Sequence, residues 1–103
     1  MQSYADAVTR RDWPAAYARV SPEARKAWPL AEFARRGDAH RLKFGFEPAG
    51  VHVRTCEERG DEATARIDDS GSAAGRHHFK DAVVLRRLDG GWRVALPVRF
   101  GQR

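Results

Sequence analysis

The sequence predicts one α+β domain over residues 1–103, with helices in its first third and a mostly antiparallel sheet in the rest. The apolar residues recur at helical spacing up to about residue 41, and from about residue 42 they alternate with polar ones, as in a strand with one buried face. The length is that of a single domain, and no internal repeat or linker divides the chain.

Three helices are predicted before residue 29. Residues 3–11 form the first, because Tyr4, Ala7 and Val8 share a face. Asp12 can cap the second helix, which has a proline in its first turn. Ser21-Pro22-Glu23 is a start signal of the same kind for the third, which should end at the residue before Pro29.

A further helical turn or two is expected after Pro29, with Leu30, Phe33 and Ala34 facing inward. Gly37 predicts the end of this helix. Residues 42–47 then alternate as a strand does, although the pairing of residues 38–50 as loop or strand is left open.

The second half of the chain predicts strands separated by turns. Val51 begins one strand, a turn follows at 58–61, and residues 63–68 form the next strand. The composition of residues 69–76 is that of a loop. Residues 77–88 form a long strand, Asp89-Gly90-Gly91 is a hairpin turn, and a last strand ends at Pro97.

Composition limits the class of protein. The net charge is +5, but the basic residues are scattered among acidic ones, so we do not expect a nucleic-acid partner, and a basic nucleic-acid binder is only a third hypothesis. Cys56 is the single cysteine, which excludes an internal disulfide and a multi-cysteine metal site. No apolar run is long enough to span a membrane. The chain as written reads as cytoplasmic, or as exported if a signal has been removed.

Several runs of residues resemble one known superfamily. Arg11-Asp12-Trp13-Pro14-Ala15-Ala16-Tyr17, then Val20-Ser21-Pro22-Glu23-Ala24-Arg25, then Leu30-Ala31-Glu32-Phe33 are similar to the helical half of nuclear transport factor 2-like (cystatin-like fold) proteins, and most of all to small bacterial members of unknown function. Leu88-Asp89-Gly90-Gly91-Trp92-Arg93-Val94 resembles their final hairpin. The resemblance implies helices packed in the concave face of a curved sheet of about four strands, with an apolar pocket at the open end of the cone.

The same resemblance suggests a catalytic hypothesis. Tyr4 lies where ketosteroid isomerases of this superfamily have a pocket tyrosine, whose phenol donates a hydrogen bond to a developing enolate. A carboxyl must then act as the base, and Asp38 and Asp81 are the candidates. The alternative is that Tyr4 is a core residue with its hydroxyl near the rim, and we prefer this alternative.

Other polar groups carry less chemistry. His77 and His78 are neighbours in a strand and point to opposite faces, and His40 and His52 lie elsewhere, so no metal site is expected. Of the pair Asp68-Asp69, at most one side chain can face inward, and we interpret both as charged strand ends. No cofactor is expected.

Aromatic residues are the remaining signal. They either fill the interior of the cone or line an apolar pocket or a dimer face. The candidate ligand-binding residues are Tyr4, Trp13, Tyr17, Trp28, Phe33, Phe46, Phe79 and Trp92.

We therefore expect a non-catalytic binding or interaction module. It would hold a small apolar molecule or a protein partner, and form a homodimer through the exposed face of the sheet. The alternative is a cavity enzyme of the ketosteroid isomerase or epoxide hydrolase type. The two differ in whether Tyr4 and a carboxyl converge on one solvent-reachable apolar cavity.

Overall fold

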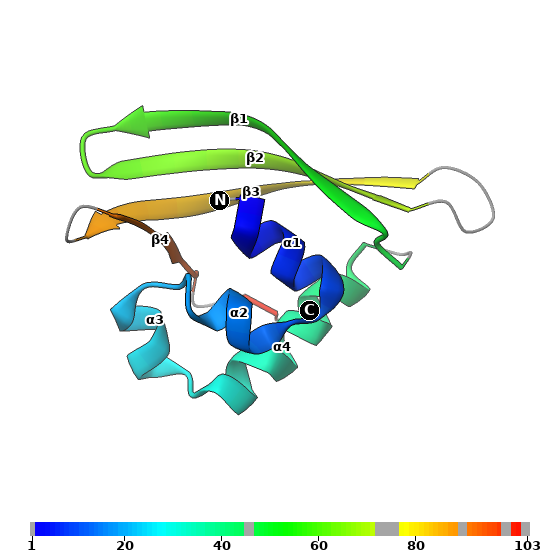
Figure 1. The fold of residues 1–103 in the computed structure, drawn as a ribbon, viewed down its shortest axis with the longest axis horizontal. Helices are drawn as coiled ribbons and strands as arrows, with labels where there is room; N and C mark the ends of the chain where they lie inside the picture. The colour runs from blue at the N-terminus through cyan, green and yellow to red at the C-terminus, as the bar shows by residue number, and fades with distance from the viewer. Residues whose placement is uncertain (1, 45–46, 72–76, 89–90, 98–99, 102–103) are drawn as a thin grey trace.

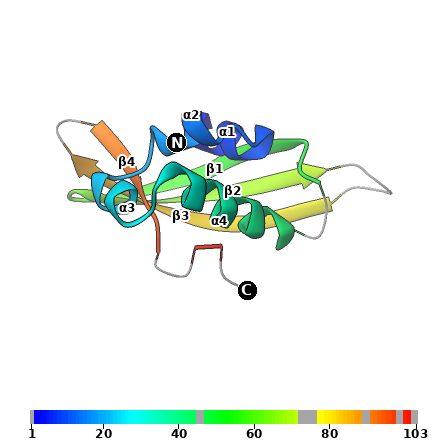
Figure 2. The same cartoon turned by 90° about the horizontal axis from the view of Figure 1, so that it is seen from below.

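The computed structural model describes residues 2–44, 47–71, 77–88, 91–97 and 100–101. It contains four helices followed by four strands, and the strands form one antiparallel sheet in the order β1-β2-β3-β4. The helices lie together on one face of this curved sheet (Figures 1 and 2), so the predicted α+β class is confirmed. The elements are α1 (Gln2–Arg10), α2 (Trp13–Tyr17), α3 (Pro22–Ala27), α4 (Leu30–Leu42), β1 (Gly50–Arg59), β2 (Glu62–Gly71), β3 (His77–Leu88) and β4 (Gly91–Ala95).

The helix starts follow the local sequence signals. The carboxylate of Asp12 accepts a hydrogen bond from the Ala15 amide at 3.3 Å, which caps α2. The hydroxyl of Ser21 accepts one from the Ala24 amide at 3.2 Å, which caps α3. Trp28 has extended backbone angles directly before Pro29, so α3 ends where the sequence predicts.

The prediction that Gly37 ends the fourth helix is wrong, because α4 continues to Leu42. Gly37 is a buried position inside the helix, and the ring of Trp13 lies against it: a Cβ built there would be 2.4 Å from a ring carbon of Trp13. The glycine therefore allows close packing of α2 on α4. Phe33 is fully buried as expected, whereas Leu30 is 39% exposed and does not face inward.

Residues 42–47, left open as loop or strand, do not form a strand in the described part of the chain. Leu42 is the last residue of α4 and is largely exposed, and β1 begins only at Gly50. Phe44 is buried beyond the helix end, where its ring packs on Phe79 with the centroids 4.6 Å apart. Two apolar residues with a spacing of two fit the end of a helix and the turn after it as well as a strand. Phe46 lies outside the described residues.

Strand β2 is longer than predicted. The loop expected from residue 69 onward is wrong for residues 69–71, which extend the strand, while residues 72–76 lie outside the described part. Asp69 pairs with Val51 on one side and with Phe79 on the other. Pairing on both sides thus overrides the turn-like composition of this segment.

The remaining strands match the sequence pattern closely. Strand β3 has the predicted bounds, and β4 pairs with it so that Gly91 lies opposite Leu88. Asp89 and Gly90 of the predicted turn lie outside the described residues. Val94 of β4 is fully buried, as the alternation requires.

The two edges of the sheet are irregular. In β1 the register with β2 shifts between Val53 and Thr55, which is a β-bulge at Arg54. Beside β4, the segment between α2 and α3 forms a short parallel bridge: the amide of Ser21 donates to the carbonyl of Val94, and the amide of Val94 donates to the carbonyl of Arg19, both at 2.8 Å.

The core lies between the helices and the inner face of the sheet. Phe33, Val20 and Val94 are its largest fully buried side chains. Trp13 packs edge-to-face on Phe33, with the centroids 5.9 Å apart. Within the described ranges, no helix is both long and apolar enough to cross a membrane.

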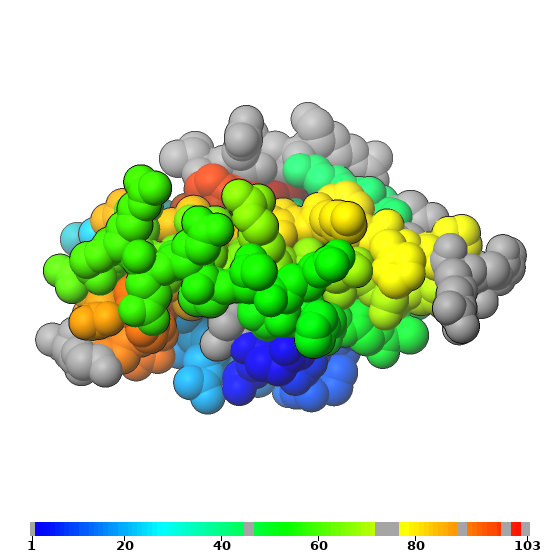
Figure 3. Space-filling model, turned by 90° about the horizontal axis from the view of Figure 1, so that it is seen from above, coloured from blue at the N-terminus to red at the C-terminus, as the bar shows by residue number. Residues whose placement is uncertain are grey.

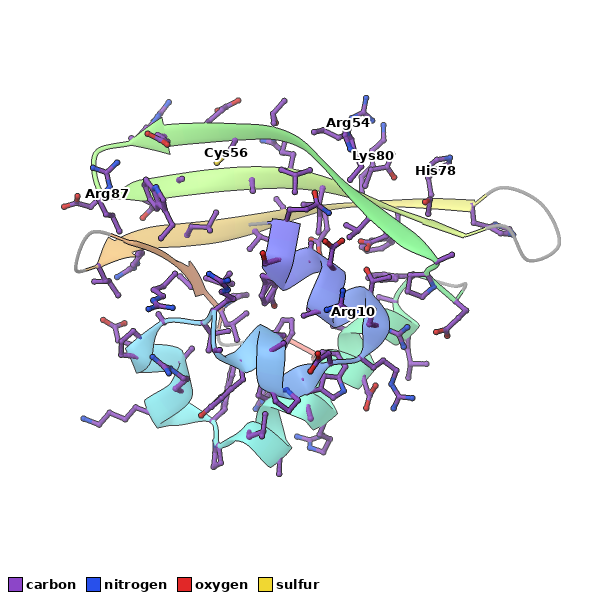
Figure 4. All side chains as sticks on the ribbon, viewed as in Figure 1. Arg10, Arg54, Cys56, His78, Lys80 and Arg87 are labelled. Carbon is purple, nitrogen blue, oxygen red and sulfur yellow. The ribbon has the colours of Figure 1, made fainter. Side chains whose placement is uncertain are left out.

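The outer face of the sheet is not covered by helices. In the space-filling view from the sheet side, the strands form the centre of the surface and α1 is seen only at its margin (Figure 3). Arg54, His78 and Lys80 extend from this face, away from the helices (Figure 4). Arg54 and His78 both pair with Asp68, at 3.7 and 3.2 Å.

Candidate functional site

A cavity of about 450 Å³ lies between the helices and the inner face of the sheet. We call it the central cavity. Its wall is mostly apolar. Four polar side chains line it, one from each of four elements: Tyr4 of α1, His40 of α4, Asp69 of β2 and Asp81 of β3. The exposed Arg86 also lines it. The lining residues are Tyr4, Ala5, Val8, His40, Phe44, Ile67, Asp69, Asp81, Ala82, Val83, Val84, Arg86, Ala95, Leu96, Pro97 and Phe100.

Helix α4 and strand β3 contribute a paired histidine and aspartate. The Nε2 atom of His40 lies 2.8 Å from Oδ2 of Asp81, and the Ala82 amide donates to Oδ1 of Asp81 at 2.8 Å. Burial would raise the pKa of Asp81, but the hydrogen bond from His40, its charge and the Ala82 amide together lower the pKa below its usual value. Asp81 is thus an ionised carboxylate with both oxygens engaged.

Asp69 on β2 is in a different state. It is 3% exposed, and its Oδ2 atom has no hydrogen-bond partner among the described residues. Burial, and next the negative charge of Asp81, raise the pKa of Asp69 to about 6. His40 and Arg41 oppose this shift only in part. Near neutral pH this carboxyl can therefore both release and accept a proton.

Tyr4 on α1 supplies the fourth polar group. It is buried, and the loss of hydration together with the charge of Asp81 raises its pKa well above the usual range. Its phenol therefore stays protonated at physiological pH and can donate a hydrogen bond. The central cavity thus combines a neutral donor, a carboxyl that titrates near neutrality and an ionised carboxylate paired with a histidine.

The structure brings together two of the three residues proposed as catalytic. Tyr4 and Asp81 line the central cavity, and Asp38 does not. Asp38 accepts hydrogen bonds from Arg11 at 2.8 and 3.2 Å, beside an open surface depression. The expectation that Asp38 could share a cavity with Tyr4 is wrong, because the continued helix α4 turns Asp38 to the opposite side from His40.

Most of the proposed aromatic residues serve the core instead. Trp13 and Phe33 are buried away from the central cavity, and Phe79 packs on Phe44. The hydroxyl of Tyr17 lies 2.9 Å from the carbonyl oxygen of Trp28, which fixes the end of α3.

Two further tryptophans are covered by arginines. The guanidinium of Arg36 lies 4.3 Å from the ring centroid of Trp28, and that of Arg87 lies 4.8 Å from the ring centroid of Trp92. Of the proposed ligand-binding residues that the structure describes, only Tyr4 lines the central cavity. Phe46 is not included in this comparison, because it lies outside the described residues.

Sequence reasoning missed His40, Asp69 and Phe100. The sequence does contain a signal for His40, because Phe33, Gly37 and His40 lie at helical spacing if α4 continues past Gly37. For Asp69 the signal was the alternation Ala63, Ala65, Ile67, which places residue 69 on the same inner face. We found no pattern that would indicate Phe100.

A second depression is rich in arginine but is less suited to a ligand. It is lined by Arg11, Arg35, Asp38 and Arg41, among others. These arginines already pair with carboxylates: Arg11 with Asp38, Arg35 with Glu32, and Arg41 with Glu47. An anion would have to displace these partners. The described ranges also contain no group of three or more histidine, cysteine or acidic side chains that could hold a metal ion.

Comparison with known proteins supports the fold and goes no further. No protein-family model matches the chain, and no curated protein matches it significantly. Among solved structures, the chain is similar to a putative NTF2-like transpeptidase from Campylobacter jejuni, with a TM-score of 0.64 and 12% identity over 93% of this chain and 94% of that one. It is also similar to a SEC-C motif containing protein from Rhodopseudomonas palustris, with a TM-score of 0.61 and 13% identity over 88% of this chain and 68% of that one. At these identities the likeness shows an NTF2-like α+β fold alone.

Proposed function

We propose that this domain binds a small, mostly apolar molecule in the central cavity. The observation that carries the proposal is the cavity itself: about 450 Å³ of space with an apolar wall and four polar groups gathered from separate elements. Its volume lies within the roughly 300–1,000 Å³ that is usual for small-molecule sites, and an apolar wall with few polar groups is their usual composition.

The position of the cavity also favours binding. Its walls come from helices α1 and α4 and from the paired strands β2 and β3, which hold the lining residues in place before a ligand arrives. A ligand then loses less free energy to ordering of the protein. Val8 and Ile67 offer apolar contact, and Tyr4 and Asp69 offer hydrogen bonds that fix an orientation.

Fluorescence of the neutral apolar probe N-phenyl-1-naphthylamine tests the proposal. We expect the probe to bind and to brighten. Ala5→Leu fills part of the cavity from α1 and should weaken binding at least tenfold. Ser3→Leu, on the exposed side of the same helix, is the matched control and should leave binding unchanged. Absence of binding, or equal binding by both variants, would contradict the proposal.

Proton transfer is the second candidate function, favoured because Tyr4 and two carboxyls line one cavity. An ionised Asp69 could take a proton from a carbon next to a carbonyl group. The C–H electron pair would form the enolate, whose oxygen would accept a hydrogen bond from Tyr4, and the proton would later return from Asp69 to carbon. Deuterium exchange at the α-carbons of 2-tetralone, followed by NMR, should be accelerated by the wild type and lost in Asp69→Asn. No acceleration would remove this candidate.

Homodimerisation through the outer face of the sheet stays a prediction. This face carries charges of both signs, such as Arg54 and Asp68, and a two-fold axis can place such groups opposite one another. Light scattering during size-exclusion chromatography distinguishes a mass of 11.6 kDa from twice that mass. A mass of 11.6 kDa at all concentrations tested would exclude the dimer.

A further inference from the structure

We infer that the molecule bound in the central cavity carries a protonated amine on an apolar body, and that Asp69 receives the ammonium group. The inference deepens the proposed function and rests on it. It starts from one buried atom, Oδ2 of Asp69, which has no hydrogen-bond partner among the described residues although Asp69 is nearly inaccessible to solvent. A buried carboxylate oxygen without a donor is unfavourable, and an incoming donor would relieve it.

The second carboxylate of the cavity, Asp81, already has partners that make it a poorer receptor for an ammonium group. Asp81 accepts hydrogen bonds at both oxygens, from His40 and from the Ala82 amide. Asp69 is therefore the acidic group of the cavity wall with an oxygen left to accept a hydrogen bond from a ligand.

No cationic side chain in the described ranges forms an ion pair with Asp69. Arg41 acts on its charge, but the Arg41 guanidinium donates to the carbonyl of Thr9 and to Glu47. Arg86 also lines the cavity, but it pairs in register with Glu62. Glu62 lies seven positions from Asp69 along β2, which is about 23 Å at the usual strand rise.

The neighbouring charges on the strands add to the negative character of the site. The charge of Asp81 acts on Asp69 from β3, and the charges of His40 and Arg41 compensate for it only in part. Asp68 adds a further negative charge from the other face of β2, where it pairs with Arg54 and His78. An ammonium group beside Asp69 would therefore meet two inward carboxylates and one histidine.

The apolar wall suits the remainder of such a molecule. Phe44 and Phe100 both line the cavity, and their faces can attract an ammonium group as well as an apolar body. Val8 and Ile67 extend the apolar surface on the helix side and the sheet side. A flat aromatic body with a short alkylammonium arm matches this combination.

Proton linkage distinguishes an amine from a carbonyl ligand. Asp69 has a pKa of about 6 in the free protein, and only its ionised form attracts a cation. Amine affinity should therefore rise between pH 5 and pH 8. A carbonyl ligand would instead accept a hydrogen bond from the protonated form of Asp69, so its affinity should fall over the same range.

The test compares 2-(naphthalen-2-yl)ethylamine with 2-(naphthalen-2-yl)ethanol, which share the apolar body. NMR titration at pH 8 should show the amine binding at least tenfold more tightly, with shifts at Val8 and Ile67, and the ratio should shrink at pH 5. Asp69→Asn should abolish the preference for the amine while keeping alcohol binding. Asp68→Asn removes a charge from the opposite face of the same strand and should keep the preference.

Each other outcome contradicts a definite step. If amine and alcohol bind equally and Ala5→Leu weakens both, the amine inference is wrong and the proposed function stands. If neither the amine nor the alcohol binds, and N-phenyl-1-naphthylamine does not bind either, both the amine inference and the proposed function are wrong. If the preference survives Asp69→Asn, or is lost equally in Asp68→Asn, Asp69 is not the receptor.

Discussion

The free energy of unfolding of an Asp69→Asn variant, measured relative to that of the wild type, should increase as the pH rises. In the wild type, burial raises the pKa of Asp69 from 3.8 to about 6, so the folded state holds its proton more tightly than the unfolded state. Between these two values the unfolded state releases the proton first. The free energy of unfolding therefore falls as pH rises through this window, is unaffected by Asp69 below it, and stays lowered above it.

The magnitude follows from the size of the shift. Each unit of pKa difference corresponds to about 1.36 kcal/mol, so a rise from 3.8 to about 6 lowers the stability by about 3 kcal/mol once the carboxyl is ionised in both states. Asparagine has nearly the same shape and does not titrate. Part of this change occurs below pH 4, so the stability of Asp69→Asn relative to wild type should increase by about 2 kcal/mol between pH 4 and pH 7, whatever constant offset the amide introduces.

Urea unfolding at half-unit pH steps, followed by tryptophan fluorescence, measures this difference directly. Asp68→Asn is the matched control, because it removes a carboxylate from the adjacent position but from the opposite face, where Asp68 pairs with Arg54 and His78. Its stability relative to wild type should show no such rise. A difference between Asp69→Asn and wild type that stays constant from pH 4 to pH 7 would refute the reasoning about Asp69.

Two stability predictions concern the helices. Gly37→Ala should destabilise the protein by about 2 kcal/mol or more in urea unfolding, because its Cβ would overlap the ring of Trp13, whereas Gly50→Ala, whose Cβ would meet only a side-chain oxygen at 3.7 Å, should be nearly neutral; equal effects would contradict the packing argument. Ser21→Ala should cost about 1 kcal/mol by removing the cap on the Ala24 amide, and an unchanged urea midpoint would show that this hydrogen bond contributes nothing.

Local signals predicted the parts of the fold that local chemistry decides. Asp12 and Ser21 cap helices where the sequence indicates, because a side-chain oxygen next to a proline specifies a helix start within a few residues. The bounds of β3 also follow from its alternation alone.

The errors arose where distant segments decide the structure. Gly37 has the sequence signature of a helix end, but its function is to admit the ring of Trp13, which is far away in the sequence. Asp69 begins a segment with the composition of a loop, but its pairing with Val51 and Phe79 makes it part of a strand. Both errors hid polar residues of the central cavity, since the first removed His40 from a helix and the second removed Asp69 from the sheet.

The irregular edges of the sheet bear on the behaviour of the protein at high concentration. An open strand edge is a template for pairing with other chains and so for aggregation. At β4 the bridge formed by Val20 occupies part of that edge, and at β1 the bulge at Arg54 interrupts the hydrogen-bonding ladder beside a run of charged residues, Glu57, Glu58 and Arg59. Each edge is thus protected in its own way, one by backbone cover and one by distortion and charge. Strand addition at either edge is therefore disfavoured in this fold.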